Sequence, residues 1–216
     1  MLVAARVFSL SHPTPRENGI KAAKEALAAG RVIALPTDTS YALAVRAMDE
    51  KALQLLWSIK GQTPKTPLTI FLGNISLLQK FCAGINDDVK NKFLCFWPGP
   101  LTLVLKGLNN LSWNKGITPN VVSVRMPLHP VAFEILGQDE ILATTTANKV
   151  GQSAGKSISE IKAQFGSDIA VYLDQGELPA SEPSSILDLS TDSPVLVREG
   201  GISLAEILKV FENTVK

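Results

Sequence analysis

The apolar positions of this chain follow two periods in turn, one typical of buried strands and one typical of amphipathic helices. Apolar runs predict strands at residues 32–35, 68–72, 101–105, 121–125, 141–144, 170–173, 185–189 and 195–198, with a further extended stretch that ends at Val45. Helical spacing predicts a first helix at 17–29, ended by Gly30. Strands that alternate with helices predict an α/β fold.

Polar residues mark where three of the later helices begin. Asp49 can cap a helix that ends near Lys60, because its carboxylate can accept the first free N–H groups. The pairs Ser157/Glu160 and Ser203/Glu206 have capping-box spacing, in which each side chain binds the N–H of the other residue. No repeat or linker is evident, so we expect one domain over residues 1–216, with a polar loop at 178–185.

Composition narrows the classes of function. With 216 residues, 45% of them apolar, the chain can bury one sizeable core. A net charge of +1 and 19% charged residues differ from the basic footprint of most nucleic-acid-binding proteins. Cys82 and Cys95 fall in helix-like stretches without a neighbouring His, which predicts buried free thiols. No run of residues is apolar enough to span a membrane, and we expect a cytoplasmic enzyme.

Two loops that follow predicted elements could hold a ligand. The Pro-Thr-Asp-Thr run at 36–39 comes directly after a buried strand, where polar groups often face a crevice, but the same residues also suit an ordinary turn. Lys60 leads into a loop at 61–67 that could hold a phosphate. Equally, Lys60 could only complement the dipole at the end of its helix.

Arg125 and the segment 144–157 add further candidates. Arg125 ends a strand on the same face as Ser123, and it is either an anion clamp or a solvated edge charge. The stretch 151–157 is one residue short of a Walker A loop, so a P-loop ATPase is disfavoured, although the loop could bind an anion at the next helix. His12 and His129 have no triad or metal partner in the sequence, which favours structural roles.

In this order the segments resemble the YrdC-type threonylcarbamoyl-AMP synthases, from about residue 30 to residue 201. The resemblance rests on Pro-Thr-Asp-Thr at 36–39 with Tyr41, the lysine loop with Pro67, Trp-Pro-Gly-Pro-Leu-Thr at 97–102, Val-Arg-Met-Pro at 124–127 with His129, Asn148, Ser184, Asp188 and Arg198. It implies a single-domain, open and twisted α/β sheet of mixed strand direction, flanked by helices, with a positively charged cleft.

The resemblance also implies a nucleotidyltransferase activity. L-Threonine and bicarbonate would form N-carboxy-threonine, which attacks the α-phosphate of ATP and expels diphosphate. The product, L-threonylcarbamoyladenylate, would pass to a downstream threonylcarbamoyl transferase complex for the threonylcarbamoyladenosine modification of tRNA. Mg²⁺ would be carried with ATP rather than by protein ligands. Binding of tRNA or double-stranded RNA is a further partner that the family suggests.

Residue roles carry over where positions match. The positions that match threonine-binding residues are Thr39, Arg125, Thr144 and Ser184, and those that match nucleotide-binding residues are Lys60, Gln62, Thr66, Thr146, Asn148 and Arg198. Lys60 and Arg125 would be the catalytic cations. Because the carbamate itself attacks, no strong protein nucleophile is needed, and catalysis would rest on positioning and charge stabilisation.

The chain departs from the family pattern at several ligand positions. Gln62 stands where the lysine loop normally has an arginine, Thr146 and Ala154 stand at serine positions, Phe71 at a histidine position of some relatives, and Ala42 at a glycine position. The threonine anchors are therefore kept better than the nucleotide anchors. Two alternatives stay open: a non-catalytic relative that binds nucleotide or structured RNA, and a role in another carbamoyl-transfer pathway.

Overall fold

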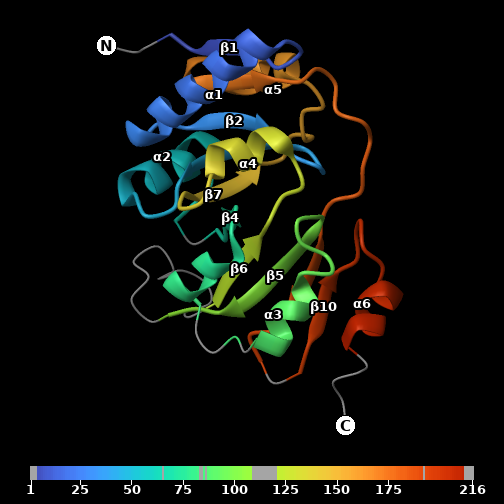
Figure 1. Cartoon of the computed structure of the whole chain (residues 1–216). Helices are drawn as coiled ribbons and strands as arrows, with labels where there is room; N and C mark the ends of the chain where they lie inside the picture. Colours follow the sequence, from blue (N-terminus) through green and yellow to red (C-terminus); the bar gives the residue numbers. More distant parts are fainter. Residues whose placement is uncertain are drawn as a thin grey trace.

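The computed structural model describes residues 4–64, 66–82, 85, 87–108, 121–191 and 193–211. A mixed sheet of ten strands runs through this part of the chain, in the order β1-β8-β2-β3-β7-β4-β6-β5-β9-β10 (Figure 1). The strands are β1 Arg6–Ser9, β2 Ile33–Pro36, β3 Tyr41–Arg46, β4 Thr69–Leu72, β5 Leu101–Lys106, β6 Val121–Arg125, β7 Ile141–Thr146, β8 Val171–Asp174, β9 Ser185–Asp188 and β10 Val195–Arg198. The prediction of an open mixed α/β sheet is confirmed.

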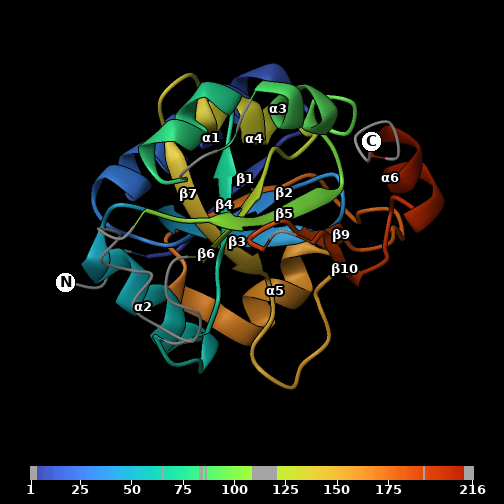
Figure 2. The same cartoon turned by 90° about the horizontal axis from the view of Figure 1, so that it is seen from below.

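Helices cover both faces of the sheet. They are α1 Pro13–Ala28, α2 Glu50–Lys60, α3 Asp87–Phe93, α4 Pro130–Leu136, α5 Ile158–Phe165 and α6 Leu204–Phe211, with 3₁₀ turns at Ile75–Lys80 and Gly166–Asp168. α1 and α4 lie on one face, and α2 and α5 lie on the other (Figure 2). Both faces are covered because alternate side chains of a strand are apolar on each side: in β3, Leu43 and Val45 belong to one apolar cluster, while Ala42 and Ala44 belong to the other.

The N-terminal segment differs from the prediction. α1 begins at Pro13 rather than at Glu17, and it is preceded by β1, which pairs in parallel with β8. β1 was not predicted because its four residues include only two apolar ones, Val7 and Phe8, which is too short a run to indicate a strand. Pro13 suits the first turn of a helix, where its missing N–H has no partner to lose.

Of the two predicted capping boxes, one is complete and the other is half formed. The Ser203/Glu206 box is complete, with Glu206 Oε2 accepting from Ser203 N at 2.9 Å and Ser203 Oγ accepting from Glu206 N at 3.3 Å. The Ser157 box is only half formed, because the Glu160 carboxylate binds the N–H of Lys156 instead.

Of the two thiols, Cys82 is buried as predicted, in a β-bridge rather than a helix.

Cys95 was predicted to be buried within a helix, and this is wrong. It is exposed in the turn that follows α3. Among the helices of the described residues, none is long and apolar enough to cross a membrane.

Candidate functional site

A cavity of about 510 Å³ lies on one face of the sheet, a size usual for small-molecule sites. Its floor is formed by side chains from seven neighbouring strands: Ala42, Thr69, Phe71, Thr102, Arg125, Thr144, Thr146, Ile186 and Arg198. The strand register places them on the same face; for example, Thr69 lies opposite Thr144, and Phe71 lies opposite Arg125. α1 packs on the same face over β1, β8, β2 and β3, and α4 packs beside α1, so the cavity lies on the part of that face that these helices leave open.

The walls of the cavity are the turn 37–40, the segment 154–156 and the loop 178–184. Thr37 Oγ1 donates to Ser40 O at 2.6 Å and accepts from the N–H groups of Thr39 and Ser40, both at 3.2 Å. Ser181 Oγ donates to Thr39 O at 2.7 Å, so the loop is tied to the turn. The segment 36–39 is therefore a hydrogen-bonded turn that also lines a cavity, while its role in holding a ligand stays a prediction.

Arg125 is the most deeply buried cation of the floor, with 4% of its surface exposed. Its Nε donates to Gly99 O at 3.1 Å, and its Nη1 donates to Thr39 Oγ1 at 2.9 Å. Nη2 lies 2.7 Å from Asp38 Oδ1, as an ion pair rather than a well-aligned hydrogen bond. Burial lowers the pKa of the guanidinium, Asp38 opposes this shift, and Arg198 adds to it. The alternative of a solvated edge charge is wrong.

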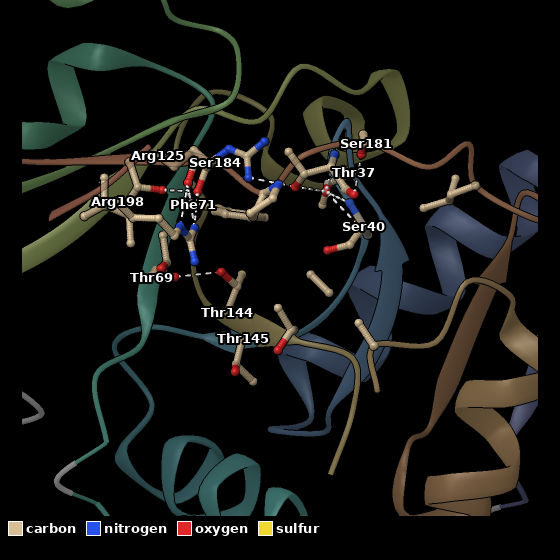
Figure 3. A pocket seen from close by; sticks show the side chains of 18 of the residues that line it. Thr37, Ser40, Thr69, Phe71, Arg125, Thr144, Thr145, Ser181, Ser184 and Arg198 are labelled. Carbon is tan, nitrogen blue, oxygen red and sulfur yellow. Dashed lines mark hydrogen bonds between the residues drawn. The ribbon is translucent and has the colours of Figure 1, made fainter. Parts of the chain in front are cut away.

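Arg198 and Ser184 form a second polar group beside Arg125. Arg198 Nε and Nη2 donate to Ser184 O at 3.0 and 2.6 Å, and Nη2 also reaches Ser184 Oγ at 3.2 Å. Ser184 Oγ lies 2.9 Å from Thr102 Oγ1. Figure 3 shows Arg125, Ser184 and Arg198 on one side of the cavity and the turn with Thr37 and Ser40 on the other. Two cations and several hydroxyl groups therefore face a space that suits a small anionic ligand.

Thr144 lines the cavity, as predicted for a threonine-binding position. Its Oγ1 donates to Thr69 O at 2.7 Å, and its side chain is 2% exposed. Since that hydroxyl hydrogen is committed to the backbone, Thr144 can offer a ligand only the lone pairs of its oxygen. Thr39, Arg125, Thr144 and Ser184 thus all lie in one cavity, while their roles toward threonine stay predictions.

Lys60 is buried behind Thr146 at the end of the floor. Its Nζ donates to Thr146 O at 2.7 Å and to Asn148 Oδ1 at 3.1 Å, and Thr146 Oγ1 donates to the same Asn148 oxygen at 2.7 Å. Burial lowers the pKa of Lys60 to about 8. Thr146 lines the cavity, whereas Lys60 and Asn148 lie one layer behind it. The side chain of Lys60 therefore does more than complement the dipole of α2.

Gln62 and Thr66 do not line the cavity. Gln62 N donates to Trp57 O at 2.8 Å, and Thr66 O accepts from Trp57 Nε1 at 3.0 Å, so the loop is folded against α2. Gln62 Oε1 is buried without a hydrogen-bond partner. Their nucleotide-binding roles stay predictions. By contrast, the departures from the family pattern at Ala42, Phe71 and Ala154 all line the cavity.

The start of α5 offers less to an anion than the sequence indicated. Gly155 and Lys156 line the cavity, but Glu160 already binds the N–H of Lys156, and Ser157 Oγ accepts from the N–H of Glu160. His129 has the structural role that was predicted. It is 7% exposed and its Nδ1 accepts from the N–H of Val131 at the start of α4.

Several site residues were missed from the sequence: Asp38 as the partner of Arg125, Ser181 as the link between the walls, and Thr69 and Thr102 on the floor. The period of two within each predicted strand could have found Thr102, which alternates with the buried Leu101 and Leu103. Loop contacts such as that of Ser181 carry no such signal. Among the described residues, no group of three or more His, Cys, Asp or Glu could hold a metal ion.

Comparison with known proteins assigns the chain to a family. A family model for the Sua5, YciO and YrdC proteins, described as "Telomere recombination", matches residues 25–200. The chain belongs to this family. One relative, a Mycobacterium leprae protein provisionally named as a threonylcarbamoyl-AMP synthase, is 34% identical over 205 residues, which cover 95% of this chain and 93% of the relative. The threonylcarbamoyl-AMP synthase of Pyrococcus abyssi is 33% identical over 84% of this chain and 54% of its own length.

Solved structures of this Sua5/YciO/YrdC family share the fold. The P. abyssi Sua5 complexed with L-threonine matches with a TM-score of 0.87 and 30% identity, covering 95% of this chain and 61% of that protein. Escherichia coli YciO matches with a TM-score of 0.78 and 25% identity, covering 96% of this chain and 99% of that protein. The sequence matches and the fold therefore agree on membership of this family.

Proposed function

We propose that this protein is a threonylcarbamoyl-AMP synthase, which forms L-threonylcarbamoyladenylate and diphosphate from L-threonine, bicarbonate and ATP. The observation that carries the proposal is Arg125, a buried and anchored cation on the floor of a cavity lined by hydroxyl groups. Support also comes from relatives named for this activity and from a solved family member that holds L-threonine.

In this proposal, the carboxylate of threonine binds Arg125. A planar guanidinium can bind both carboxylate oxygens at once, and burial strengthens the interaction because water competes less. Thr39 and Ser184 supply hydroxyl groups on either side, and Thr144 supplies an acceptor. The cavity is thus suited to a small, polar amino acid with an oxygen on its side chain.

The nucleotide is proposed to extend across the floor between Thr146 on β7 and Arg198 on β10. Lys60 supplies positive charge behind Thr146, with Asn148 fixing both groups. Gln62 and Thr66 lie outside the cavity lining, so their contribution would require contacts to parts of ATP beyond it. Mg²⁺ is proposed to be held by ATP, since the residues lining the cavity offer hydroxyls and cations but no carboxylate.

The chemistry needs no protein nucleophile. The amine of threonine forms an N–C bond with the carbon of bicarbonate and water leaves, giving the carbamate. A carbamate oxygen then bonds to the α-phosphorus of ATP, and the bond to diphosphate breaks. Arg125 holds one end of the attacking molecule, while Lys60 and Arg198 stabilise the charge on the phosphates as diphosphate leaves.

The test is diphosphate release by the purified protein with ATP, Mg²⁺ and bicarbonate, in the presence and absence of L-threonine and with L-serine as a control. We expect release that requires threonine and is weaker with serine, which lacks the methyl group. ATP binding without any release would instead indicate a non-catalytic relative. The same assay with an Arg125→Gln variant is expected to lose threonine-dependent release while ATP still binds.

We further propose that the labile product passes to a separate threonylcarbamoyl transferase complex that acts on tRNA in the cytoplasm. The product contains a mixed anhydride, which hydrolyses readily in water. A downstream enzyme must therefore take up the threonylcarbamoyl group before it is lost to hydrolysis. Binding of tRNA or double-stranded RNA is a prediction that a mobility-shift measurement would test. A net charge of +1 leads us to expect weak, salt-sensitive binding.

A further inference from the structure

The Arg125 guanidinium is fixed by three residues from two segments of the chain, the turn 37–40 and the loop that contains Gly99. Gly99 O accepts from Nε, Thr39 Oγ1 accepts from Nη1, and Asp38 Oδ1 pairs with Nη2. The ring of Phe71 lies beside it, 5.9 Å from Cζ to the ring centroid. Of these partners, only Asp38 brings a negative charge.

Asp38 lies outside the lining of the cavity. Thr37 and Thr39 both line it, but Asp38 between them does not. The carboxylate side chain is 13% exposed, and its Oδ2 atom is buried without a hydrogen-bond partner. Asp38 therefore pairs with Arg125 from outside the lining of the cavity.

Asp38 also joins the two segments that carry the clamp. Its Oδ1 accepts from the N–H of Leu128 at 3.2 Å, just beyond the end of β6, while Asp38 itself lies in the turn between β2 and β3. One carboxylate oxygen thus contacts both the side chain of Arg125 and the backbone that follows it. The Thr39 hydroxyl and the Arg125 guanidinium are held in one geometry by this contact.

A countercharge is needed at this position because a second cation lies nearby. Arg198 belongs to the same cavity floor and disfavours the charge on Arg125. Without Asp38, the two guanidinium groups would repel each other, and a buried cation would be left without its ion-pair partner. The side chain of Arg125 would then be held only by Gly99 O and Thr39 Oγ1, against the repulsion from Arg198.

We propose that Asp38 is a positioning residue for the substrate clamp, which holds the Arg125 guanidinium in the orientation that receives the carboxylate of the amino-acid substrate. The inference rests on the proposed function, since it takes L-threonine as the ligand of Arg125. It makes a prediction opposite to that of simple electrostatics. Removing a negative charge raises the positive potential of the cavity and would by itself tighten the binding of an anion, whereas loss of positioning weakens it.

The experiment is isothermal titration calorimetry of L-threonine into the wild-type protein and the Asp38→Asn variant, with ATP titrated separately. We expect about tenfold weaker threonine binding, the range of one charged hydrogen bond, and unchanged ATP binding. The matched control is Asp49→Asn, which also removes one carboxylate but lies at the start of α2, where asparagine can cap as well. Unchanged or tighter threonine binding by Asp38→Asn would overturn the proposal.

Two further variants keep the test decisive. If Asp38→Asn does not fold because Arg125 is left unpaired, Asp38→Glu keeps the charge and moves it by one methylene group, and it is expected to fold and to bind threonine less tightly. In an Arg125→Lys background, Asp38→Asn should have almost no further effect on threonine binding. An equal effect in both backgrounds would show that Asp38 acts independently of Arg125. If the wild-type protein itself binds no threonine, it is the proposed function that fails.

Discussion

Lys60 is a buried cation that contacts the backbone oxygen of Thr146 and the side chain of Asn148. Burial lowers its pKa from 10.5 to about 8, so the folded protein loses this proton at a pH where an ordinary lysine keeps it. We predict that ATP affinity falls as the pH rises through about 8. Titrations of ATP between pH 7 and pH 9.5 measure this, and Lys60→Arg, which keeps its charge, serves as the control. Identical pH profiles for the two proteins would contradict the assignment.

Loss of the two cations proposed to be catalytic, Arg125 and Lys60, is expected to have different effects. Arg125→Ala removes the clamp and should raise the KM for threonine by tenfold or more, on the order of one buried charged contact. Lys60→Ala should mainly slow diphosphate release at saturating substrates, because it removes charge beside the phosphates. Steady-state kinetics with each substrate varied in turn separate the two effects. Small and equal effects would indicate that the cavity is not the site.

Site residues that belong to a recognisable motif could be predicted from the sequence, whereas those that only the fold brings to the site could not. Arg125, Ser184 and Arg198 followed from the resemblance, although the sequence left Arg125 open between a clamp and an edge charge. The burial of Arg125 excludes the solvated edge charge, and this burial depends on strands that are distant in the sequence. The loop contact of Ser181 follows from no sequence period, because a loop side chain finds its partner only once both segments are in place.

At the scale of single elements, the complete capping box of α6 gives a direct test. Ser203 and Glu206 each satisfy an N–H of the other. Ser203→Ala is expected to destabilise the protein by about 1 kcal/mol. Chemical denaturation measures this, and Ser157→Ala, in the half-formed box of α5, is the comparison. A cost near zero for Ser203→Ala would mean that α6 contributes little to the stability of the whole.

Gly200 is an element-scale constraint on the site. A Cβ there would lie 2.1 Å from Pro183 O and 3.0 Å from the carbonyl carbon of Ser184. Gly200→Ala should push the loop 178–184 away from β10, which breaks the contact between Arg198 and Ser184. We predict weaker threonine binding from a substitution that touches no cavity side chain, measured by calorimetry. Gly61→Ala has open space around its Cβ and its φ is 72°, so it controls for backbone strain alone.

The elements themselves were predicted well where they are buried. Nine of the ten strands were expected from apolar runs, since a strand inside a sheet must be apolar on at least one face. The tenth, β1, lies at an edge as β10 does, but it lacks the run of three apolar residues, Val195 to Val197, that made β10 predictable. The half-formed box at Ser157 shows the limit of spacing rules, because the Glu160 carboxylate can choose between two adjacent N–H groups and the sequence does not say which.

At the scale of the whole molecule, one sheet connects both halves of the chain. The larger apolar cluster includes Val32 and Tyr41 near the start and Ile202 and Ile207 near the end. We therefore predict a single cooperative unfolding transition over the chain. Circular dichroism and tryptophan fluorescence should give the same midpoint, because Trp57 and Trp97 both belong to this cluster. Separate midpoints would indicate two independently folding units and contradict the single-domain prediction.

The order of the strands could not be predicted from the sequence. Only three pairs of neighbouring strands are also consecutive in the chain: β2 with β3, β5 with β6 and β9 with β10. The remaining neighbours, such as β5 with β9 and β1 with β8, join segments that are distant in the chain. Such pairing is decided by the whole set of buried faces rather than by any one segment, so it is visible only in the folded molecule.

The floor of the cavity has a consequence for synthesis on the ribosome. Its first residue is Ala42 on β3 and its last is Arg198 on β10, and these two strands bound the seven-strand floor on opposite sides. A nascent chain therefore cannot present a complete pocket until β10 has left the exit tunnel. Substrates cannot assist the early steps of folding, and truncated products that lack the final strands should be inert rather than partly active.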